Sequence, residues 1–291
     1  MQREITRELV RRLLPGRMAE SNKGSYGSVL AAAGSMAYRG AAALCTEGAL
    51  RGGAGLVYLA SVEPVIQLVL SRTPECCACG CRTAANGGIH PQDADALRRW
   101  FADRHAVLLA GPGLGESAAD VCKALLGRNA PWAGAVLDAD ALNALAAGKY
   151  RGDLPANTIL TPHPGEAARL LGLTVPEVQA DREGAAVSLA EKYHCVAVLK
   201  GHHTLVAAPD GTVWRNETGN AGLAKGGSGD VLTGVIASLM AQRADALRAA
   251  AVGVWLHGRA GDLAEQELTA YSVTPEDVVR KLPDAIREIL E

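Results

Sequence analysis

The residues best suited to chemistry form the run Gly226-Gly227-Ser228-Gly229-Asp230, which the apolar segment 231–236 follows directly. Glycines at the start of a helix let backbone N–H groups approach an anion closely, and the helix dipole favours negative charge there. Asp230 would lie in the first turn, where it suits the dipole and could also act as a catalytic base. The alternative is a glycine-rich loop with an ordinary Asp cap. The run matches neither the P-loop nor the dinucleotide-binding fingerprint, so it indicates a different kind of phosphate site.

Further polar, glycine and proline residues gather where the predicted buried strands end. In open α/β sheets, ligands bind beyond the carboxyl ends of the strands, so these residues are expected to face one cleft along the sheet edge. Asp138 and Asp140 are interpreted as polar cleft residues or helix caps without a catalytic role. The strand-end segments are Gly34-Ser35, Gly111-Pro112-Gly113, Asp138-Ala139-Asp140, Thr161-Pro162-His163-Pro164-Gly165-Glu166 and Lys200-Gly201.

Strands and helices alternate along most of the chain, which predicts a mostly parallel central sheet with helices on both faces. A β-hairpin formed by 204–208 and 212–215 is expected to extend that sheet, and long helices are expected at 231–242 and 244–263. The sequence has no linker or domain-scale repeat, so residues 1–291 are expected to form a single domain. The other predicted strands are 28–33, 56–60, 106–110, 135–137, 158–160 and 195–199, and the other predicted helices are 40–51, 64–70, 118–126, 141–147, 166–171 and 176–193.

Charge and hydropathy exclude several classes of protein. The 29 Lys and Arg residues against 31 Asp and Glu leave a net charge of −2, which argues against a generally basic nucleic-acid binder. The N-terminal segment lacks the apolar core of a signal peptide, and no segment reaches the roughly 18 consecutive apolar residues of a membrane span. We therefore expect a cytoplasmic protein that acts on small molecules, without a nucleic-acid or membrane partner.

The seven cysteines are expected to be reduced in that compartment. Four of them lie in the segment Cys76-Cys77-Ala78-Cys79-Gly80-Cys81, where Cys76 and Cys79 have the spacing of a zinc-ligand pair. No second pair follows, and the nearest histidine, His90, stands alone, whereas zinc sites commonly need two pairs. We therefore interpret the cluster as a short strand that uses cysteine as a small apolar residue.

The longer string from Gly219 to Gly234, GNAGLAKGGSGDVLTG, resembles the ADP-dependent NAD(P)H-hydrate dehydratases of the ribokinase-like superfamily. Ala221 and Leu223 replace a Pro and a Met that are usual in that string. The resemblance covers roughly residues 5 to 285 and implies a ribokinase-like fold, without the N-terminal epimerase domain of some relatives. Other segments that resemble the family are Lys23-Gly24-Ser25-Tyr26-Gly27, Gly34-Ser35, Tyr38-Arg39-Gly40-Ala41-Ala42, Gly52-Gly53-Ala54-Gly55-Leu56-Val57, Gly111-Pro112-Gly113-Leu114-Gly115, Asp138-Ala139-Asp140-Ala141-Leu142, Leu160 to Glu166 and Lys200-Gly201.

The resemblance implies repair of NADHX and NADPHX, the hydrated and redox-inactive forms of NADH and NADPH. Their S-epimers would lose water while ADP becomes AMP and phosphate, because phosphorylation turns the ring hydroxyl into a good leaving group. Asp230 would take the hydroxyl proton, as a positioned Asp does in kinases. The amides of Gly227, Ser228 and Gly229 would form an anion hole for the phosphoryl charge. Mg²⁺ would bridge the diphosphate oxygens, and the family suggests a homotetramer.

The resemblance also assigns binding residues. Ala41, Gly113, His163 and Asp230 would contact the hydrated dinucleotide, and Glu166 would organise Mg²⁺ through water. For His163 the alternative is a polar loop residue, and for Glu166 it is a charge favoured by a helix start. The segment Lys200-Gly201-His202-His203-Thr204, together with Gly229, would contact ADP, with the lysine suited to phosphate; the alternative for this segment is a plain β-turn with solvent-exposed histidines.

Two rival functions are weighed against the dehydratase. A small-molecule kinase of the hydroxyethylthiazole or pyridoxal kinase type would release a stable phosphorylated product. Kinases of this superfamily often have Asn at the position of His163, so the histidine argues against that function. A non-catalytic nucleotide-binding protein would have no need of a base at Asp230.

Overall fold

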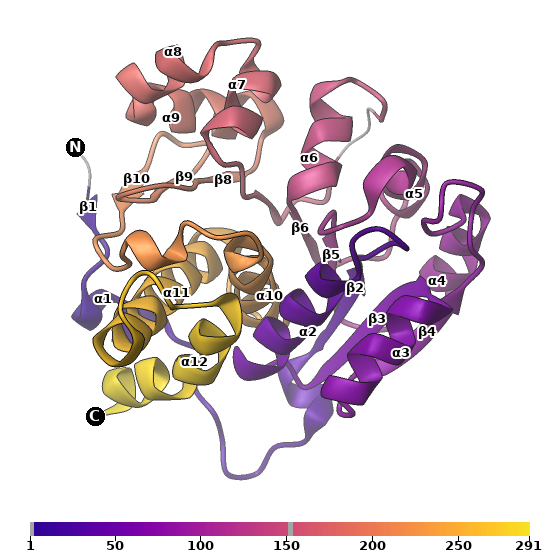
Figure 1. Cartoon of the computed structure of the whole chain (residues 1–291), viewed down its shortest axis with the longest axis horizontal. Coiled ribbons are helices and arrows are strands. Elements are labelled where there is room, and N and C mark those ends of the chain that lie inside the picture. Colours follow the sequence, from indigo (N-terminus) through magenta and orange to yellow (C-terminus); the bar gives the residue numbers. More distant parts are fainter. Residues whose placement is uncertain (1–2, 151–153) are drawn as a thin grey trace.

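The computed structural model describes residues 3–150 and 154–291, and its centre is one ten-stranded sheet between two layers of helices (Figure 1). The strands are β1 Arg3–Glu4, β2 Ser28–Ala32, β3 Leu56–Val62, β4 Cys77–Cys81, β5 Ala106–Ala110, β6 Gly134–Leu137, β7 Thr158–Leu160, β8 Val196–Leu199, β9 Leu205–Ala207 and β10 Val213–Arg215. Their order across the sheet is β1-β10-β9-β8-β7-β6-β5-β2-β3-β4. All strands from β8 to β4 run parallel, whereas β9 is antiparallel to both neighbours. The mostly parallel sheet and the β9–β10 hairpin predicted from the sequence are therefore confirmed.

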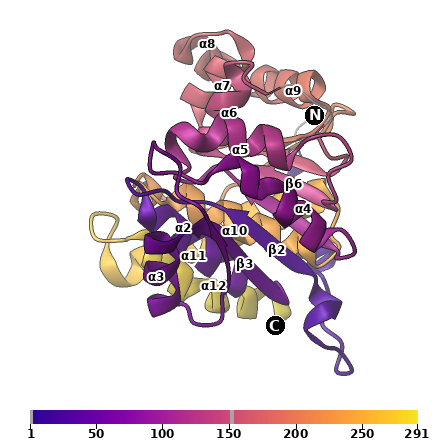
Figure 2. The same ribbon diagram turned by 90° about the vertical axis from the view of Figure 1, so that its right-hand side faces the viewer.

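Two apolar cores lie on opposite faces of the sheet. Helices α1, α2, α3, α10, α11 and α12 supply one core, and helices α4 to α9 supply the other, as Figure 2 shows from the side. The helices are α1 Arg7–Leu13, α2 Arg39–Arg51, α3 Glu63–Arg72, α4 Ala94–Phe101, α5 Ala118–Leu125, α6 Ala139–Ala146, α7 Pro164–Leu171, α8 Val175–Ala180, α9 Arg182–Tyr193, α10 Ser228–Ala241, α11 Ala246–Leu268 and α12 Pro275–Leu290. Because both faces are covered, the central strands β2 and β5 are buried at every residue, which explains their continuous apolar sequences.

Most predicted elements agree with the structure to within a few residues, but two points differ. The predicted helix 176–193 is wrong, because the chain breaks at Asp181 into α8 and α9. The Asp181 carboxylate accepts the amide of Gly184 and so caps a new helix, which a continuous helix would not need. Helices α1, α4 and α12 were not expected. The predicted cysteine strand is confirmed as β4, at one end of the sheet.

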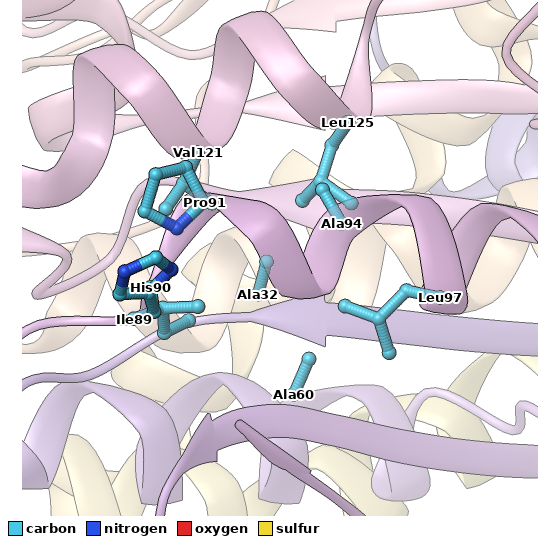
Figure 3. Close-up of a pocket in the computed structure, with 9 residues that line it drawn as sticks. All are labelled: Ala32, Ala60, Ile89, His90, Pro91, Ala94, Leu97, Val121 and Leu125. Atoms are coloured by element: carbon cyan, nitrogen blue, oxygen red, sulfur yellow. The ribbon is translucent and has the colours of Figure 1, made fainter. Parts of the chain in front are cut away.

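A small apolar pocket lies between α4, α5 and the strands β2 and β3 (Figure 3). It is lined mainly by alanine and aliphatic side chains, with His90 and Pro91 at one side, and it has no room for a water molecule. It is therefore a packing defect of the core. None of the helices in the described ranges 3–150 and 154–291 is long and apolar enough to cross a membrane.

Candidate active site

The side chain of Asp138, at the end of β6, connects the end of β8 to the first turns of α10. This residue follows β6 and is 1% exposed. Lys200, which follows β8, donates from Nζ to Asp138 Oδ1 at 2.7 Å. The hydroxyl of Thr233, on α10, lies 2.8 Å from Asp138 Oδ2 and 2.8 Å from the Gly229 carbonyl oxygen, and these two acceptors share its one proton. Asp138 takes the N-cap position of α6, as one of its two interpretations predicts, but its side chain makes no capping hydrogen bond and is buried instead.

Asp230 lies in the first turn of α10 beside this group. Its pKa is raised to about 7, first by burial and then by the negative charge of Asp138, while Lys200 opposes the shift. Asp140 and Glu166 raise the same pKa further. A carboxylate with a pKa near neutrality can accept a proton at physiological pH and release it again, as a general base must. The electrostatics of the site therefore suit Asp230 to that role.

The glycine-rich loop turns into α10 as the sequence predicts. Gly227 is the N-cap with φ of +99°, a left-handed conformation that a side chain would disfavour. The amide of Ser228 donates to the carbonyl of Lys225 at 3.3 Å, so an anion would have to compete for that donor. Lys225 itself donates from Nζ to the carbonyls of Tyr271 and Val273, at 2.6 and 2.5 Å, which ties the loop to the segment before α12. The loop is thus held in place from both sides.

His163 and Glu166 form a reciprocal cap at the start of α7. Nδ1 of His163 accepts the amides of Gly165 and Glu166, and Glu166 Oε2 accepts the amide of His163 at 2.8 Å. The Glu166 carboxylate is 3.9 Å from Lys200 Nζ. Burial, followed by the charge of Lys200, lowers the pKa of His163, so its imidazole is neutral at physiological pH. Glu166 is therefore a charge at a helix start, as the alternative interpretation predicts, and it is buried close to Lys200.

A cavity of about 770 Å³ extends from His163 past Lys200 to the start of α10. All five residues of the segment 200–204 line it, together with Ser228 and Gly229. The structure therefore brings together the residues that the resemblance assigned to ADP. His203 Nδ1 lies 2.6 Å from Glu217 Oε2 at the rim. The remaining lining residues are Pro164, Asn216, Glu217, Thr218, Gly219, Asn220, Ala221, Leu223, Ala224, Lys225, Leu232, Val254, His257 and Gly258.

Several of these lining residues were not predicted. Thr218 directly precedes the glycine-rich string, so proximity to that motif is the signal that could have found it. His257 is a single polar residue in an apolar stretch of α11, a pattern typical of a buried histidine. Burial lowers the pKa of His257 to about 4, so it lines the cavity as a neutral ring. Its neighbour Gly258 was not marked by any local sequence signal.

Ala41 and Gly113 lie next to each other, apart from the residues that line the cavity. A Cβ atom placed on Gly113 would be 2.6 Å from the Tyr38 carbonyl oxygen and 3.0 Å from Ala41 Cβ. Gly113 also has φ of +64°. The glycine is therefore required for the loop after β5 to pack on the start of α2, in addition to any room that it leaves for a ligand. Nearby, Asp140 Oδ2 accepts the amide of Gly115 at 2.8 Å.

The site fits a hydrated magnesium ion better than a directly ligated one. Within the described ranges, no group of three or more His, Cys, Asp and Glu side chains is placed to hold a metal. Asp138 is already bonded to Lys200, and Glu166 caps α7. The carboxylates nevertheless outnumber the one lysine, and burial together with Asp138 raises the pKa of Glu166. Mg²⁺ keeps several of its waters and binds carboxylates, so Glu166 could hold it through water.

The chain matches known proteins over most of its length. Residues 29–284 match the family described as NAD(P)H-hydrate dehydratase. The bifunctional NAD(P)H-hydrate repair enzyme of Moorella thermoacetica is 42% identical over 294 residues, which cover 99% of this chain and 54% of that enzyme. The chain thus spans about half the length of that relative. The ADP-dependent (S)-NAD(P)H-hydrate dehydratase of Bacillus subtilis is 37% identical over 282 residues, covering 96% of this chain and 95% of that enzyme.

A solved structure supports the same conclusion. The ADP/ATP-dependent NAD(P)H-hydrate dehydratase from Bacillus subtilis, co-crystallised with ATP and Mg²⁺, superposes with a TM-score of 0.85 at 35% identity, covering 99% of each chain. The family and the ribokinase-like fold predicted from the motifs are therefore confirmed, and the names of these relatives favour a dehydratase over a small-molecule kinase. This chain belongs to the NAD(P)H-hydrate dehydratase family.

Proposed function

We propose that the chain dehydrates the S-epimers of NADHX and NADPHX and converts ADP to AMP and phosphate. The family supports this hydro-lyase activity. The observation that carries the proposal is Asp230, a carboxylate with a pKa near 7 in the first turn of α10. That helix begins at the glycine-rich loop, and its residues Ser228, Gly229 and Leu232 line the large cavity. A non-catalytic nucleotide-binding protein would have no use for such a base.

In the first step, the ring hydroxyl attacks the β-phosphorus of ADP. A new phosphorus–oxygen bond forms, the bond to AMP breaks, and Asp230 takes the hydroxyl proton. In the second step, the carbon–oxygen bond to phosphate breaks and the neighbouring ring carbon gives up a proton to water, which restores the double bond of NADH. The phosphoryl group thus makes hydroxide, a poor leaving group, into phosphate, a good one.

The start of α10 would stabilise the charge that develops during transfer. We assign the anion hole to the amides of Gly227, Ser228 and Gly229, where the helix dipole adds to the hydrogen bonds. Bound Mg²⁺, organised by Glu166 through water, would neutralise charge on the diphosphate. Lys200 would contribute a positive charge beside the first turn of α10, since a Cβ atom on Gly229 would lie 3.1 Å from Lys200 Nζ.

Two subsites follow from the arrangement. ADP would occupy the cavity lined by the segment 200–204 and Gly229. The hydrated dinucleotide would lie toward Ala41 and Gly113, with its ring at Asp230. His163 is among the residues that line the cavity, so we propose that it contacts the dinucleotide as well as capping α7. This order places the reacting hydroxyl between the two nucleotides, at the start of α10.

The test is incubation of the purified chain with NADHX and ADP while the absorbance band of NADH is followed. The proposal expects NADH, AMP and phosphate in equal amounts, and no NADH when ADP is left out. A stable phosphorylated product formed from a vitamin precursor would favour the kinase instead. Replacement of ADP by ATP, and of Mg²⁺ by other divalent cations, would establish the donor and cation preferences.

We further propose that the chain works in the cytoplasm as a homotetramer and that residues 1–291 form one domain. All seven cysteines are free thiols, which suits a reducing compartment. One continuous sheet contains every strand from β1 to β10, and the C-terminal helix α12 packs on α2 near the N-terminus. Both contacts suit a single domain. Sedimentation or light scattering would measure the oligomeric state.

A further inference from the structure

Asp138 makes contacts that the proposed reaction does not explain. Both of its carboxylate oxygens are occupied, one by Lys200 Nζ at 2.7 Å and the other by the Thr233 hydroxyl at 2.8 Å. We propose that Asp138 is a positioning residue. Its carboxylate holds Lys200 away from Asp230, so that Asp230 forms no ion pair and can act as the base. The inference rests on the proposed function only in the role given to Asp230.

The backbone around Asp138 is built to hold this carboxylate in place. The amide of Asp138 donates to the carbonyl of Ala110, at the end of the neighbouring strand β5. A Cβ atom on Gly111 would lie 1.8 Å from the Asp138 carbonyl oxygen, so only glycine permits this approach. Thr233 is fully buried and lies on α10, one turn after Asp230. Asp138 therefore ties the ends of β6 and β8 to the helix that carries Asp230.

The charges around Asp230 show why the position of Lys200 matters. Asp138, Asp140 and Glu166 face it from the ends of the strands and from α7, Lys200 faces it from the end of β8, and the buried thiol of Cys45 lies on α2. Lys200 is the single cation in this group. Among the described residues, Lys200 forms ion pairs with Asp138 and Glu166, and it forms none with Asp230. A lysine that moved to Asp230 would pair with the base and weaken it.

The first experiment compares Asp138→Asn with Asp140→Asn. Each variant removes one negative charge near Asp230, but only the first releases Lys200. The titration of Asp230 is followed by carbon NMR of protein labelled at the aspartate carboxyl groups, with the Asp230 signal assigned from Asp230→Asn. We expect the midpoint of Asp230 to fall by about one pH unit or more in Asp138→Asn and by less in Asp140→Asn. A shift in Asp138→Asn no larger than that in Asp140→Asn would overturn the proposal.

The second experiment keeps every charge and so remains informative if Asp138→Asn does not fold. Thr233→Val removes one of the two hydrogen bonds that hold the Asp138 carboxylate. We expect the Asp230 midpoint to fall by about 0.3 pH unit or more, because a less firmly held carboxylate lets Lys200 approach the base. An unchanged or raised midpoint would overturn the proposal. Both titrations need no substrate, so they succeed or fail independently of the reaction that we propose.

The same variants then report on turnover. In Asp138→Asn, the acid limb of the pH profile of kcat should move to lower pH by the shift that NMR measures, and kcat above that limb should fall because the base is weaker. A variant with a purely structural defect would lose kcat equally at every pH. An acid limb that stays in place while the Asp230 midpoint moves would show that Asp138 does not act through the base, and this also would overturn the proposal.

Discussion

A Cβ atom placed on Gly234 of α10 would lie 2.1 Å from the carbonyl oxygen of Cys45 on α2. The two helices therefore touch backbone to backbone at this point. Gly48 of α2 makes the reciprocal approach, since a Cβ atom there would lie 2.6 Å from the carbonyl of Val231. Ala41 lies in the first turn of the same α2, and Asp230 lies in the first turn of the same α10. The close approach of the two helices thus fixes Ala41 relative to Asp230, two residues that we assign to the dinucleotide.

The first prediction follows from this contact. Gly234→Ala should lower the free energy of unfolding by at least about 1–3 kcal/mol, because the added methyl group must push α2 and α10 apart. Urea denaturation measures the change. Gly80→Ala is the matched control, since a Cβ atom at Gly80 meets nothing within 4 Å, and it should change stability little. Equal stabilities for the two variants would contradict the backbone contact.

The second prediction concerns turnover at Asp230. Asp230→Asn should fold, bind ADP and lose roughly 10²-fold or more of kcat, the usual effect of removing a general base. In the unsubstituted chain the base must be ionised, and its pKa is about 7. Activity should therefore rise as the pH increases through about 7 and level off above it. Near-normal turnover in Asp230→Asn would remove this carboxylate from the mechanism.

The third prediction concerns the stability of the same variant. The pKa of Asp230 is raised from 3.8 to about 7 in the folded chain, so folding favours its protonated form. The free energy of unfolding should therefore fall as the pH rises from about 4 to about 7, because the carboxylate ionises more readily in the unfolded chain. Asparagine cannot ionise, so Asp230→Asn should gain about 1–4 kcal/mol over the unsubstituted chain at pH 8 and little at pH 4.

Urea denaturation at the two pH values measures this gain. Asp103→Asn, at an exposed aspartate, provides the control and should show no comparable gain at pH 8. A variant Asp230→Asn that is less stable than the unsubstituted chain at pH 8 would contradict the raised pKa. The expected result, a more stable and inactive enzyme, would show that the site keeps a destabilising charge for its chemistry.

Local patterns predicted most of the fold. The strand β5 and the strand β7 were predicted at their observed bounds, because buried parallel strands are continuous apolar runs that end at glycine, proline or polar residues. The break at Asp181 was missed, because a side-chain cap inside an otherwise helical pattern depends on where the neighbouring helix packs. Strand order was also beyond a sequence argument, since it depends on contacts between distant segments.

The candidate site was predicted only in part, because some of its contacts join segments that are distant along the chain. Residues next to a glycine-rich or strand-end motif, such as Lys200 and Gly229, were found, and the structure brings them to one cavity. The contacts of Asp138 with Lys200 and Thr233 were not predicted, because these two partners are 62 and 95 residues away along the chain. His257 was missed, since a single polar residue within a helix does not show which cavity it borders.

The fourth prediction concerns the cysteine cluster. Protein purified without an affinity tag should contain no stoichiometric zinc in elemental analysis. Cys76 belongs to the core on one face of the sheet, whereas Cys79 packs against the core on the other face, so one ion cannot reach both thiols. Burial raises the pKa of Cys76 to about 12 and that of Cys79 to about 11, which disfavours the thiolates that zinc needs. One zinc ion per chain that is lost in a Cys76→Ala/Cys79→Ala double variant would prove this prediction wrong.

The last prediction separates two roles of His163. Its Nδ1 caps α7, and its ring lines the cavity that we assign to ADP, where we propose that it also contacts the dinucleotide. His163→Ala should lower the free energy of unfolding by about 1 kcal/mol through loss of the cap. It should also raise the KM for NADHX roughly ten- to a hundredfold, because a hydrogen bond to a charged group of the substrate is lost. The KM for ADP should change little, since ADP would lie toward the segment 200–204.

His163→Asn is the control that isolates the second role. Asparagine is a good N-cap, so this variant should recover the stability lost in His163→Ala. Its shorter side chain does not extend as far as the imidazole, so the KM for NADHX should remain high. If asparagine restored the KM as well, His163 would act only as a helix cap, and its assignment to the substrate would be wrong. If the KM for ADP rose as much as that for NADHX, the division of the cleft into two subsites would be wrong instead.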